Sequence, residues 1–282
     1  MCLGAYGMWG FMPVYWPLLR PADAMEILAH RVAWSLLVLV ALLGFRRKLG
    51  TFWRIGRRRL VALAAAALLI CVNWGVYIWA VNHGRVVETA LGYFINPLVT
   101  VMLGVVVLRE RLRRAQWLAI GIAAVAVAVL TANYGRLPWI SIVLASSFAA
   151  YGLVKKRVGI GAVESLAIET MFLAGPAILY LVVRTLDGSS AFAHVSRAED
   201  ARLAFTGVLT TAPLLCFAGA ANRVSFTTLG LMQYVAPTLQ FLLGVLYFHE
   251  AMPAQRWFGF ALVWSALGVF ALDLAVTRQA RA

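Results

Sequence analysis

The sequence is poor in charged residues. Only 13% of its 282 residues are Asp, Glu, Lys or Arg, whereas an ordinary soluble domain carries roughly 25%. Hydrophobic residues make up 63%, so the chain has too few polar side chains to cover a surface in water. Long apolar runs recur along its whole length, and runs of about 18 or more residues are typical of transmembrane helices. The composition therefore excludes a soluble globular protein.

The sequence also lacks the motifs of nucleotide, metal and hydrolase sites. Its three cysteines, Cys2, Cys71 and Cys216, lie in apolar segments and show neither a disulfide framework nor metal-ligand spacing. His249-Glu250 begins like a zinc-protease motif but has no second histidine. No Gly-rich phosphate loop and no Ser-His-Asp set occurs. We therefore expect no enzyme activity, no cofactor, no metal and no direct use of ATP.

The apolar runs predict an all-α integral membrane protein with ten transmembrane helices. The predicted spans are residues 2–19, 25–45, 60–81, 89–108, 115–132, 137–154, 163–183, 203–222, 228–248 and 255–275. The net charge of +14 would suggest nucleic acid in a soluble protein. In a membrane protein, basic residues instead gather in cytoplasmic loops, so we expect a lipid bilayer and no nucleic acid as the partner.

The basic residues also predict the orientation. Seventeen of the 25 Lys and Arg fall on one side of the ten spans, in residues 46–59, 109–114, 155–157, 223 and 278–281. Seven fall on the other side, and Arg31 lies inside a span. The positive-inside rule then places both termini in the cytoplasm.

The two halves of the chain resemble each other. Six residues recur at an offset of 140, namely Asn82/Asn222, Leu91/Leu231, Pro97/Pro237, Gly104/Gly244, Glu110/Glu250 and Trp117/Trp257. We divide the chain into repeats at residues 1–134 and 135–282, with five helices in each. Because five is odd, the second repeat must enter the membrane from the opposite face. Inverted repeats are typical of secondary transporters, although channels and a few membrane enzymes share them.

The copies disagree at one charged position. Residues 26–31 match residues 164–169 at an offset of 138, with Arg31 in one half and Glu169 in the other. Charges at this depth persist mostly where they face a cavity or a partner. We hypothesise that the two lie at opposite ends of one polar cavity, where they attract a zwitterion or exchange a proton. Alternatively, Arg31 extends to the headgroups. The adjacent His30 is either a proton carrier or a tie between helices.

Other polar and aromatic side chains lie inside the predicted spans. The candidates for binding a substrate are Asn73, Trp74, Tyr77, Tyr93, Asn96, Ser146, Tyr151, Gln233, Tyr234 and Gln240. Aromatic faces with a few amides suit a small organic compound. The same residues equally suit hydrogen bonding and packing between helices.

The positions of two prolines and two asparagines predict where helices bend and where they end. Pro97 and Pro237 each remove a helical hydrogen bond inside a span, so they predict matched kinks that either gate the protein or only shape it. Asn82 and Asn222 end their spans, where asparagine often closes a helix in the left-handed conformation. We expect both asparagines to be caps.

Four segments of the chain resemble a known protein family. Residues 26–35, 73–84, 91–98 and 228–242 carry it, including Leu91-Gly92-Tyr93-Phe94-Ile95-Asn96-Pro97 and Gln233-Tyr234-Val235-Ala236-Pro237. The chain resembles the EamA-type branch of the drug/metabolite transporter superfamily, and within it the RarD group. The resemblance covers nearly the full length. It implies ten helices in two inverted repeats, a permease of the bacterial inner membrane, and alternating access around a central cavity.

We therefore expect a secondary transporter for a small organic metabolite or drug-like compound, with or without proton coupling. The alternatives are a membrane enzyme acting on lipid-linked substrates and a receptor or assembly subunit that transports nothing. The sequence does not distinguish a monomer from a homodimer.

Overall fold

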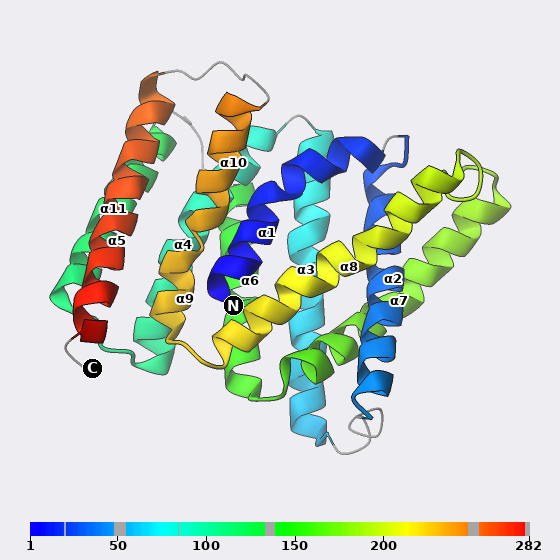
Figure 1. The fold of residues 1–282 in the computed structure, drawn as a ribbon, viewed down its shortest axis with the longest axis horizontal. Coiled ribbons are helices and arrows are strands. Elements are labelled where there is room, and N and C mark those ends of the chain that lie inside the picture. Colours follow the sequence, from blue (N-terminus) through cyan, green and yellow to red (C-terminus); the bar gives the residue numbers. More distant parts are fainter. Residues whose placement is uncertain (20, 48–54, 84, 133–138, 248–253, 280–282) are drawn as a thin grey trace. The chain divides into compact units, whose positions relative to one another are not determined.

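The computed structural model describes residues 1–19, 21–47, 55–83, 85–132, 139–247 and 254–279. The described residues form α-helices, one 3-10 helix and short turns (Figure 1). The helices, in chain order, are α1 (Cys2–Tyr15), η1 (Trp16–Leu19), α2 (Ala24–Phe45), α3 (Arg57–Asn82), α4 (Val86–Leu108), α5 (Arg114–Ala132), α6 (Trp139–Val158), α7 (Ala162–Leu186), α8 (Arg197–Ala221), α9 (Phe226–Met232), α10 (Val235–Leu246) and α11 (Ala254–Gln279).

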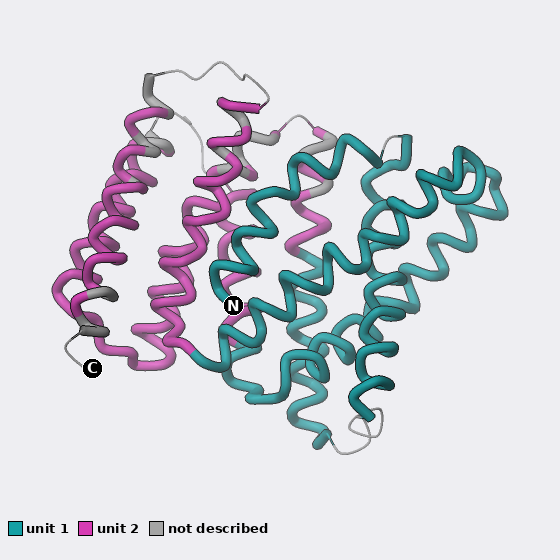
Figure 2. Tube along the Cα trace, viewed as in Figure 1, with its two compact units in different colours: residues 1–72, 154–223 teal, residues 73–153, 224–282 magenta. Residues whose placement is uncertain are grey.

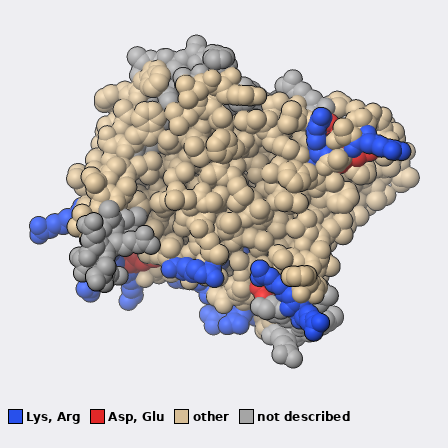
Figure 3. All heavy atoms as spheres, viewed as in Figure 1, with Lys and Arg blue, Asp and Glu red and all other residues tan. Residues whose placement is uncertain are grey.

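The helices confirm the predicted fold class, and each of the ten predicted spans contains one. The first span includes both α1 and η1, and the ninth is divided into α9 and α10. Within the described residues, five helical segments are long and apolar enough to cross a membrane: Ala24–Phe45, Arg57–Tyr77, Leu91–Leu108, Ala162–Leu186 and Arg197–Ala221. On the face drawn in Figure 3, Lys and Arg lie at helix ends, and other residues form the surface along the helices. Large apolar side chains such as Leu68 and Leu179 are exposed in the structure, as a lipid-facing surface requires.

Local sequence explains where several helices begin. Asp23 accepts a hydrogen bond from the backbone N–H of Glu26 (2.8 Å) at the start of α2. Ser196 does the same for Glu199 (3.1 Å) at the start of α8. In both cases a Glu follows three residues after the cap, which is the capping-box spacing.

The prolines act differently in the two halves. Pro97 lies inside the continuous helix α4. Near Pro237 the helix is interrupted, with Gln233 and Tyr234 between α9 and α10. The N–H of Ala236 bonds the carbonyl of Gln233 (3.2 Å), which Pro237 cannot reach because it has no N–H. The expected left-handed cap at Asn222 is wrong, because this residue ends α8 with φ −78° and ψ −13°.

The chain forms two compact units that do not follow its two halves (Figure 2). Unit 1 contains residues 1–72 and 154–223, and unit 2 contains residues 73–153 and 224–282. Two of the three boundaries therefore fall inside α3 and α6, and the third lies between α8 and α9. The division into repeats at residue 134 concerns sequence ancestry rather than packing, and it stays a prediction.

In unit 1, α2 packs against α7 and α8, and α1 packs against α8. The backbones of α8 and α2 approach each other closely at Gly207 of α8. A Cβ atom there would lie 2.5 Å from the carbonyl carbon of Trp34 in α2. The Ser35 hydroxyl donates to the Gly207 carbonyl (3.2 Å). Glycine at this position lets the two backbones meet, as small residues do between membrane helices.

In unit 2, α4 packs against α9, and α5 packs against α11. Phe94, Val101, Ala123, Tyr234 and Phe270 belong to its buried apolar core.

Two packed pairs, α2 with α7 and α5 with α11, consist of counterparts in the sequence repeat, and the helices of each pair run antiparallel. In unit 1, Arg184 near the end of α7 pairs with Asp23 just before α2 (2.7 Å). In unit 2, Arg113 just before α5 pairs with Asp273 near the end of α11. An inverted repeat requires antiparallel counterparts. The inverted relation stays a prediction, and these pairs support it.

The helices α4 and α9 are also antiparallel. Tyr234, beyond the end of α9, donates to the carbonyl of Phe94 early in α4 (3.2 Å). Glu110, beyond the end of α4, accepts from the N–H of Phe226 at the start of α9 (2.6 Å). Residue numbers therefore rise along α4 as they fall along α9.

Candidate functional site

A buried ion pair joins α6 and α7 in unit 1. The Lys155 ammonium donates to a carboxylate oxygen of Glu169 (2.6 Å) and to the hydroxyl of Ser165 (2.7 Å). Both charged side chains are 2% exposed. Glu169 is the eighth residue of α7, which places it roughly 10 Å from the start of the helix. The predicted intramembrane charge at Glu169 thus has an opposite charge and a hydroxyl as partners.

Lys155 is a site residue that the sequence does not single out. In the sequence it stands with Lys156 and Arg157 among the basic residues that predict the orientation. Neighbouring positions on a helix point about 100° apart, so the three side chains face different surroundings. Lys155 is buried, Lys156 is half-buried and Arg157 is exposed. The signal for Lys155 in the sequence is its position three residues before the end of α6, since the next helix carries Glu169.

Arg31 lies on α2 and faces other parts of unit 1. Its Nε donates to the hydroxyl of Thr210 on α8 (2.9 Å). Its guanidinium lies over the ring of Trp16, 5.1 Å from the ring centroid. A guanidinium over an indole is a favourable cation–π arrangement. These contacts favour a role inside the protein over extension to the headgroups.

His30 takes part in an aromatic cluster. Its Nδ1 accepts from the indole N–H of Trp34 (3.2 Å), and its ring lies 4.9 Å from that of Phe192. Its other nitrogen, Nε2, is buried and has no hydrogen-bond partner among the described residues. His30 therefore ties α2 to the segment between α7 and α8, which agrees with the simpler of the two predicted roles.

Glu26 holds that same segment. Its Oε1 accepts from the hydroxyl of Ser190 (2.7 Å), the N–H of Ala191 (2.7 Å) and the N–H of Phe192 (3.4 Å). Glu26 is 1% exposed. Its carboxylate thus fixes the α7–α8 connection on the first turn of α2, a role that the repeat alignment gave no means of predicting.

Unit 2 contains most of the predicted polar and aromatic candidates. Asn73 on α3 donates to the carbonyl of Leu144 (2.8 Å) and to the hydroxyl of Ser147 (3.0 Å) on α6. Ser147 is buried, whereas the predicted Ser146 is exposed. The one-residue difference turns the side chain to another face of α6.

The aromatic candidates of unit 2 lie on three helices. Tyr77 on α3 and Tyr93 on α4 have ring centroids 6.1 Å apart. Tyr151 on α6 is fully buried and packs against Phe148, with 5.9 Å between the centroids. Trp74 is half-buried.

A chain of polar side chains connects α4 to the joint between α9 and α10. The Gln233 amide donates to the hydroxyl of Thr100 (3.2 Å), and that hydroxyl donates to the Asn96 side-chain oxygen (3.4 Å). Gln240 on α10 is half-buried, and Pro97 and Pro237 are buried. The structure thus brings Asn96 and Gln233, two predicted candidates, to one place through Thr100, which the sequence did not single out.

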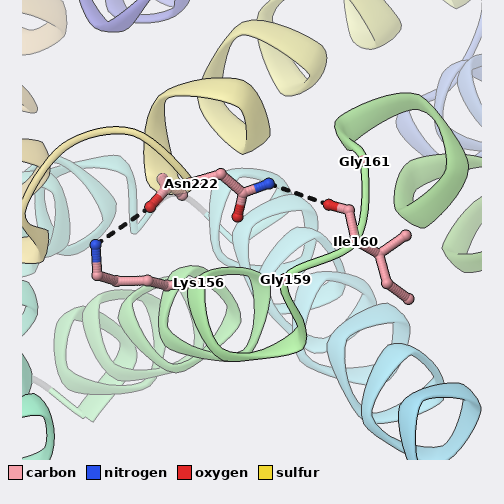
Figure 4. A pocket seen from close by; sticks show the side chains of 6 residues that line it. Lys156, Gly159, Ile160, Gly161 and Asn222 are labelled. Atoms are coloured by element: carbon pink, nitrogen blue, oxygen red, sulfur yellow. Dashed lines mark hydrogen bonds between the residues drawn. The ribbon is translucent and has the colours of Figure 1, made fainter.

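A cavity of about 400 Å³ lies in unit 1 between the end of α6, the turn before α7 and the end of α8 (Figure 4). Its lining residues are Lys156, Gly159, Ile160, Gly161, Ala221 and Asn222. Lys156 donates to the Ala221 carbonyl (3.3 Å), and Asn222 donates to the Ile160 carbonyl (3.0 Å). The two polar side chains thus fasten helix ends together, and the described lining includes none of the predicted site residues.

Among the described residues, no group of three or more His, Cys, Asp and Glu side chains could hold a metal ion.

An all-helical fold with apolar exposed faces and charges buried inside it defines a multi-span membrane protein. Comparison with known proteins gives the family. Residues 1–132 match the EamA-like transporter family. Protein RarD of Streptomyces exfoliatus is 56% identical over 283 residues, covering 99% of this chain and 90% of that protein. The chain belongs to the EamA-like transporter family, within its RarD group.

Two further comparisons agree with this assignment. A protein of Pseudomonas aeruginosa named an uncharacterized transporter is 42% identical over 274 residues, covering 96% of this chain and 92% of that one. A solved crystal structure has a TM-score of 0.73 at 18% identity and covers 100% of this chain and 97% of that one. The latter likeness shows the fold alone. The family and its relatives identify a multi-pass membrane transporter from a bacterial transporter family.

Proposed function

We propose that this protein is a secondary transporter that moves a small organic compound across the bacterial inner membrane by alternating access, with both termini in the cytoplasm. The observation that carries the proposal is the buried pair of Lys155 and Glu169 inside unit 1. Charges within membrane helices are rare and are found where a protein moves ions or substrates. Arg31 on α2, also in unit 1, holds the repeat position that corresponds to Glu169.

Proton exchange at Glu169 would provide the coupling. When Glu169 is ionised, Lys155 and Ser165 hold it between α6 and α7. A protonated Glu169 would no longer balance the charge of Lys155, so the pair would separate and the hairpin of α6 and α7 would be free to move. Alternating access requires an element with two conformations. Binding of a proton at Glu169 would shift the equilibrium between two conformations of the α6–α7 hairpin.

The test is transport by purified protein in proteoliposomes. A thermal-shift screen in detergent selects the stabilising compound, and counterflow of that compound is measured with imposed pH gradients. We expect the wild-type rate to follow the gradient and the Glu169→Gln rate not to follow it. Glu199→Gln is the control, because Glu199 is also buried in unit 1 but pairs with Arg202, and it should keep the pH dependence. An unchanged rate and pH dependence in Glu169→Gln would refute coupling at this residue.

Absence of counterflow for every stabilising compound would instead refute transport and favour a receptor or assembly role. The orientation is tested separately, by fusing green fluorescent protein to the C-terminus. A cytoplasmic terminus gives fluorescent cells, and dark cells with an intact fusion would contradict it.

A further inference from the structure

The joint between α9 and α10 contains a buried amide that is only half satisfied. Gln233 is 5% exposed. Its Nε2 donates to the Thr100 hydroxyl, whereas its Oε1 is buried and has no partner among the described residues. The side-chain carbonyl oxygen of Gln233 is therefore a buried acceptor without a donor among the described residues.

Buried polar groups in folded proteins are nearly always hydrogen-bonded, and leaving one unpaired opposes folding. A leucine or methionine of similar size at this position would leave no side-chain polar group unpaired. Packing alone therefore does not explain a glutamine at position 233. A glutamine suits a position at which another molecule donates the missing hydrogen bond to its oxygen.

The backbone around Gln233 is built to bring this amide to α4. A Cβ atom at Gly230 would lie 3.0 Å from the Thr100 methyl group and 3.1 Å from the Pro97 carbonyl oxygen. Only glycine allows this approach without displacement. The break before Pro237 then ends α9 at Met232, directly before Gln233. The amide is thus held at a helix break, the feature at which transporters form substrate sites.

The polar side chains around Gln233 determine which chemical groups a ligand can present to them. The hydrogen-bonded chain consists of the Gln233 amide, the Thr100 hydroxyl and the Asn96 amide, all of which are uncharged. Thr100 is fully buried and Asn96 is 7% exposed. An amide or a hydroxyl can both donate and accept in such a chain, whereas a bare carboxylate would be desolvated without a counter-charge.

We propose that Gln233, Thr100 and Asn96 form a binding site in unit 2 for an uncharged amide or hydroxyl group of the transported compound. The site opens to water during transport, when α9 and α10 move at the joint. This inference rests on the proposed transport function, and it names the chemical class of the substrate.

The first experiment asks whether the site meets water. Cys2, Cys71 and Cys216 are replaced by alanine, and single cysteines are introduced as Thr100→Cys or Val101→Cys. Both positions are buried, at 0% and 1% exposure, on consecutive residues of α4. Val101 belongs to the apolar core, so it is the matched control.

Membrane vesicles carrying each variant are treated with 2-aminoethyl methanethiosulfonate, which reacts with thiolates in contact with water. We expect Thr100→Cys to react roughly tenfold faster or more than Val101→Cys, because a buried apolar thiol is inert. Equal rates at the two positions would overturn the proposal.

The second experiment tests the ligand class with benzamide and benzoate, which differ only in the group presented. Benzamide should slow labelling of Thr100→Cys and raise the melting temperature of the wild type, and benzoate should do neither. Gln233→Met should abolish the benzamide effect while its own melting temperature is unchanged or higher. A benzoate effect equal to that of benzamide, or a benzamide effect that survives in Gln233→Met, would refute the assignment.

Gln116→Met is the control for the amide. Gln116 is also buried, but its oxygen accepts from the backbone N–H of Arg113 (2.9 Å) at the start of α5. Its replacement should lower the melting temperature and leave the benzamide effect intact. A lower melting temperature in Gln233→Met would show that Gln233 is a structural amide of the same kind. The labelling ratio is measured without any transported compound, so its failure is separate from a failure of counterflow.

Discussion

The Lys155–Glu169 pair allows a quantitative test of what a buried charge does in this fold. Lys155→Met leaves the Glu169 carboxylate buried without its counter-charge, and Glu169→Met does the same to the ammonium. Removing one member of a buried pair destabilises a protein by about 3–5 kcal/mol. At 2% exposure, neither group reaches water without local opening, so the full effect should appear. Replacing both by methionine should be nearly neutral, because two apolar side chains of similar volume fill the space.

The assay is a double-mutant cycle in detergent, read as melting temperature. For a chain of this size, a loss of 3–5 kcal/mol corresponds to roughly 6–15 °C. Lys156→Met is the control. It removes a neighbouring cation whose hydrogen bond goes to the Ala221 carbonyl (3.3 Å), and such a bond contributes about 1 kcal/mol.

Two results would refute the reasoning about this pair. One is a single-variant loss no larger than that of Lys156→Met. The other is a double variant as unstable as the worse single variant. If the double variant is stable and yet does not transport, the pair has a function in addition to its structural role. If the double variant is stable, transports at the full rate and keeps its pH dependence, the pair has only a structural role.

Three further predictions concern the same melting measurement. Gly207→Ala should lower stability by about 1–3 kcal/mol, because its methyl group would overpack α2, whereas Gly7→Ala, with open space around its Cβ, should not. Ala193→Gly should be neutral or stabilising by about 1 kcal/mol, because Ala193 has φ +63° and glycine tolerates that conformation. Glu110→Gln should cost about 1–2 kcal/mol, because its carboxylate accepts from two N–H groups at the start of α9 (2.6 and 2.8 Å). A stabilised Gly207→Ala, a destabilised Ala193→Gly or a neutral Glu110→Gln would each contradict the geometry described.

The sequence was sufficient to predict the helices because their signals are local. Apolar runs of spanning length define ten segments, but they do not fix the helix ends: α8 begins at Arg197, after its cap Ser196 and six residues before the predicted span. The charged position inside α7 was likewise predictable, because a glutamate in an apolar run is conspicuous in any membrane sequence.

The partners were not predictable because they depend on which helix faces meet. Lys155 reads as one of three consecutive basic residues, and only the rotation of α6 selects it for Glu169. The same rotation selects Ser147 instead of Ser146 as the partner of Asn73. A single sequence contains helix periodicity but not the crossing geometry of neighbouring helices, so it predicts candidate residues better than it predicts their contacts.

The contact between Phe94 and Tyr234 shows why the duplicated positions need not do the same work. These residues are 140 positions apart and are counterparts in the repeat. If a two-fold axis relates the repeats, counterparts that touch must lie beside that axis, where identical residues would make identical, reciprocal contacts. Here the Tyr234 hydroxyl donates to the Phe94 carbonyl (3.2 Å), and phenylalanine has no hydroxyl with which to return the bond.

The side chains also differ between Thr100 and its counterpart Gln240, and between Arg31 and its counterpart Glu169. At each of these positions the side chains of the two repeats differ, so the two halves of the chain are chemically different. A transporter built from two equal halves would present equal sites to both sides of the membrane. Substitutions between counterparts break that equality, so we expect these positions, rather than the prolines and asparagines that both halves share, to determine the direction and specificity of transport.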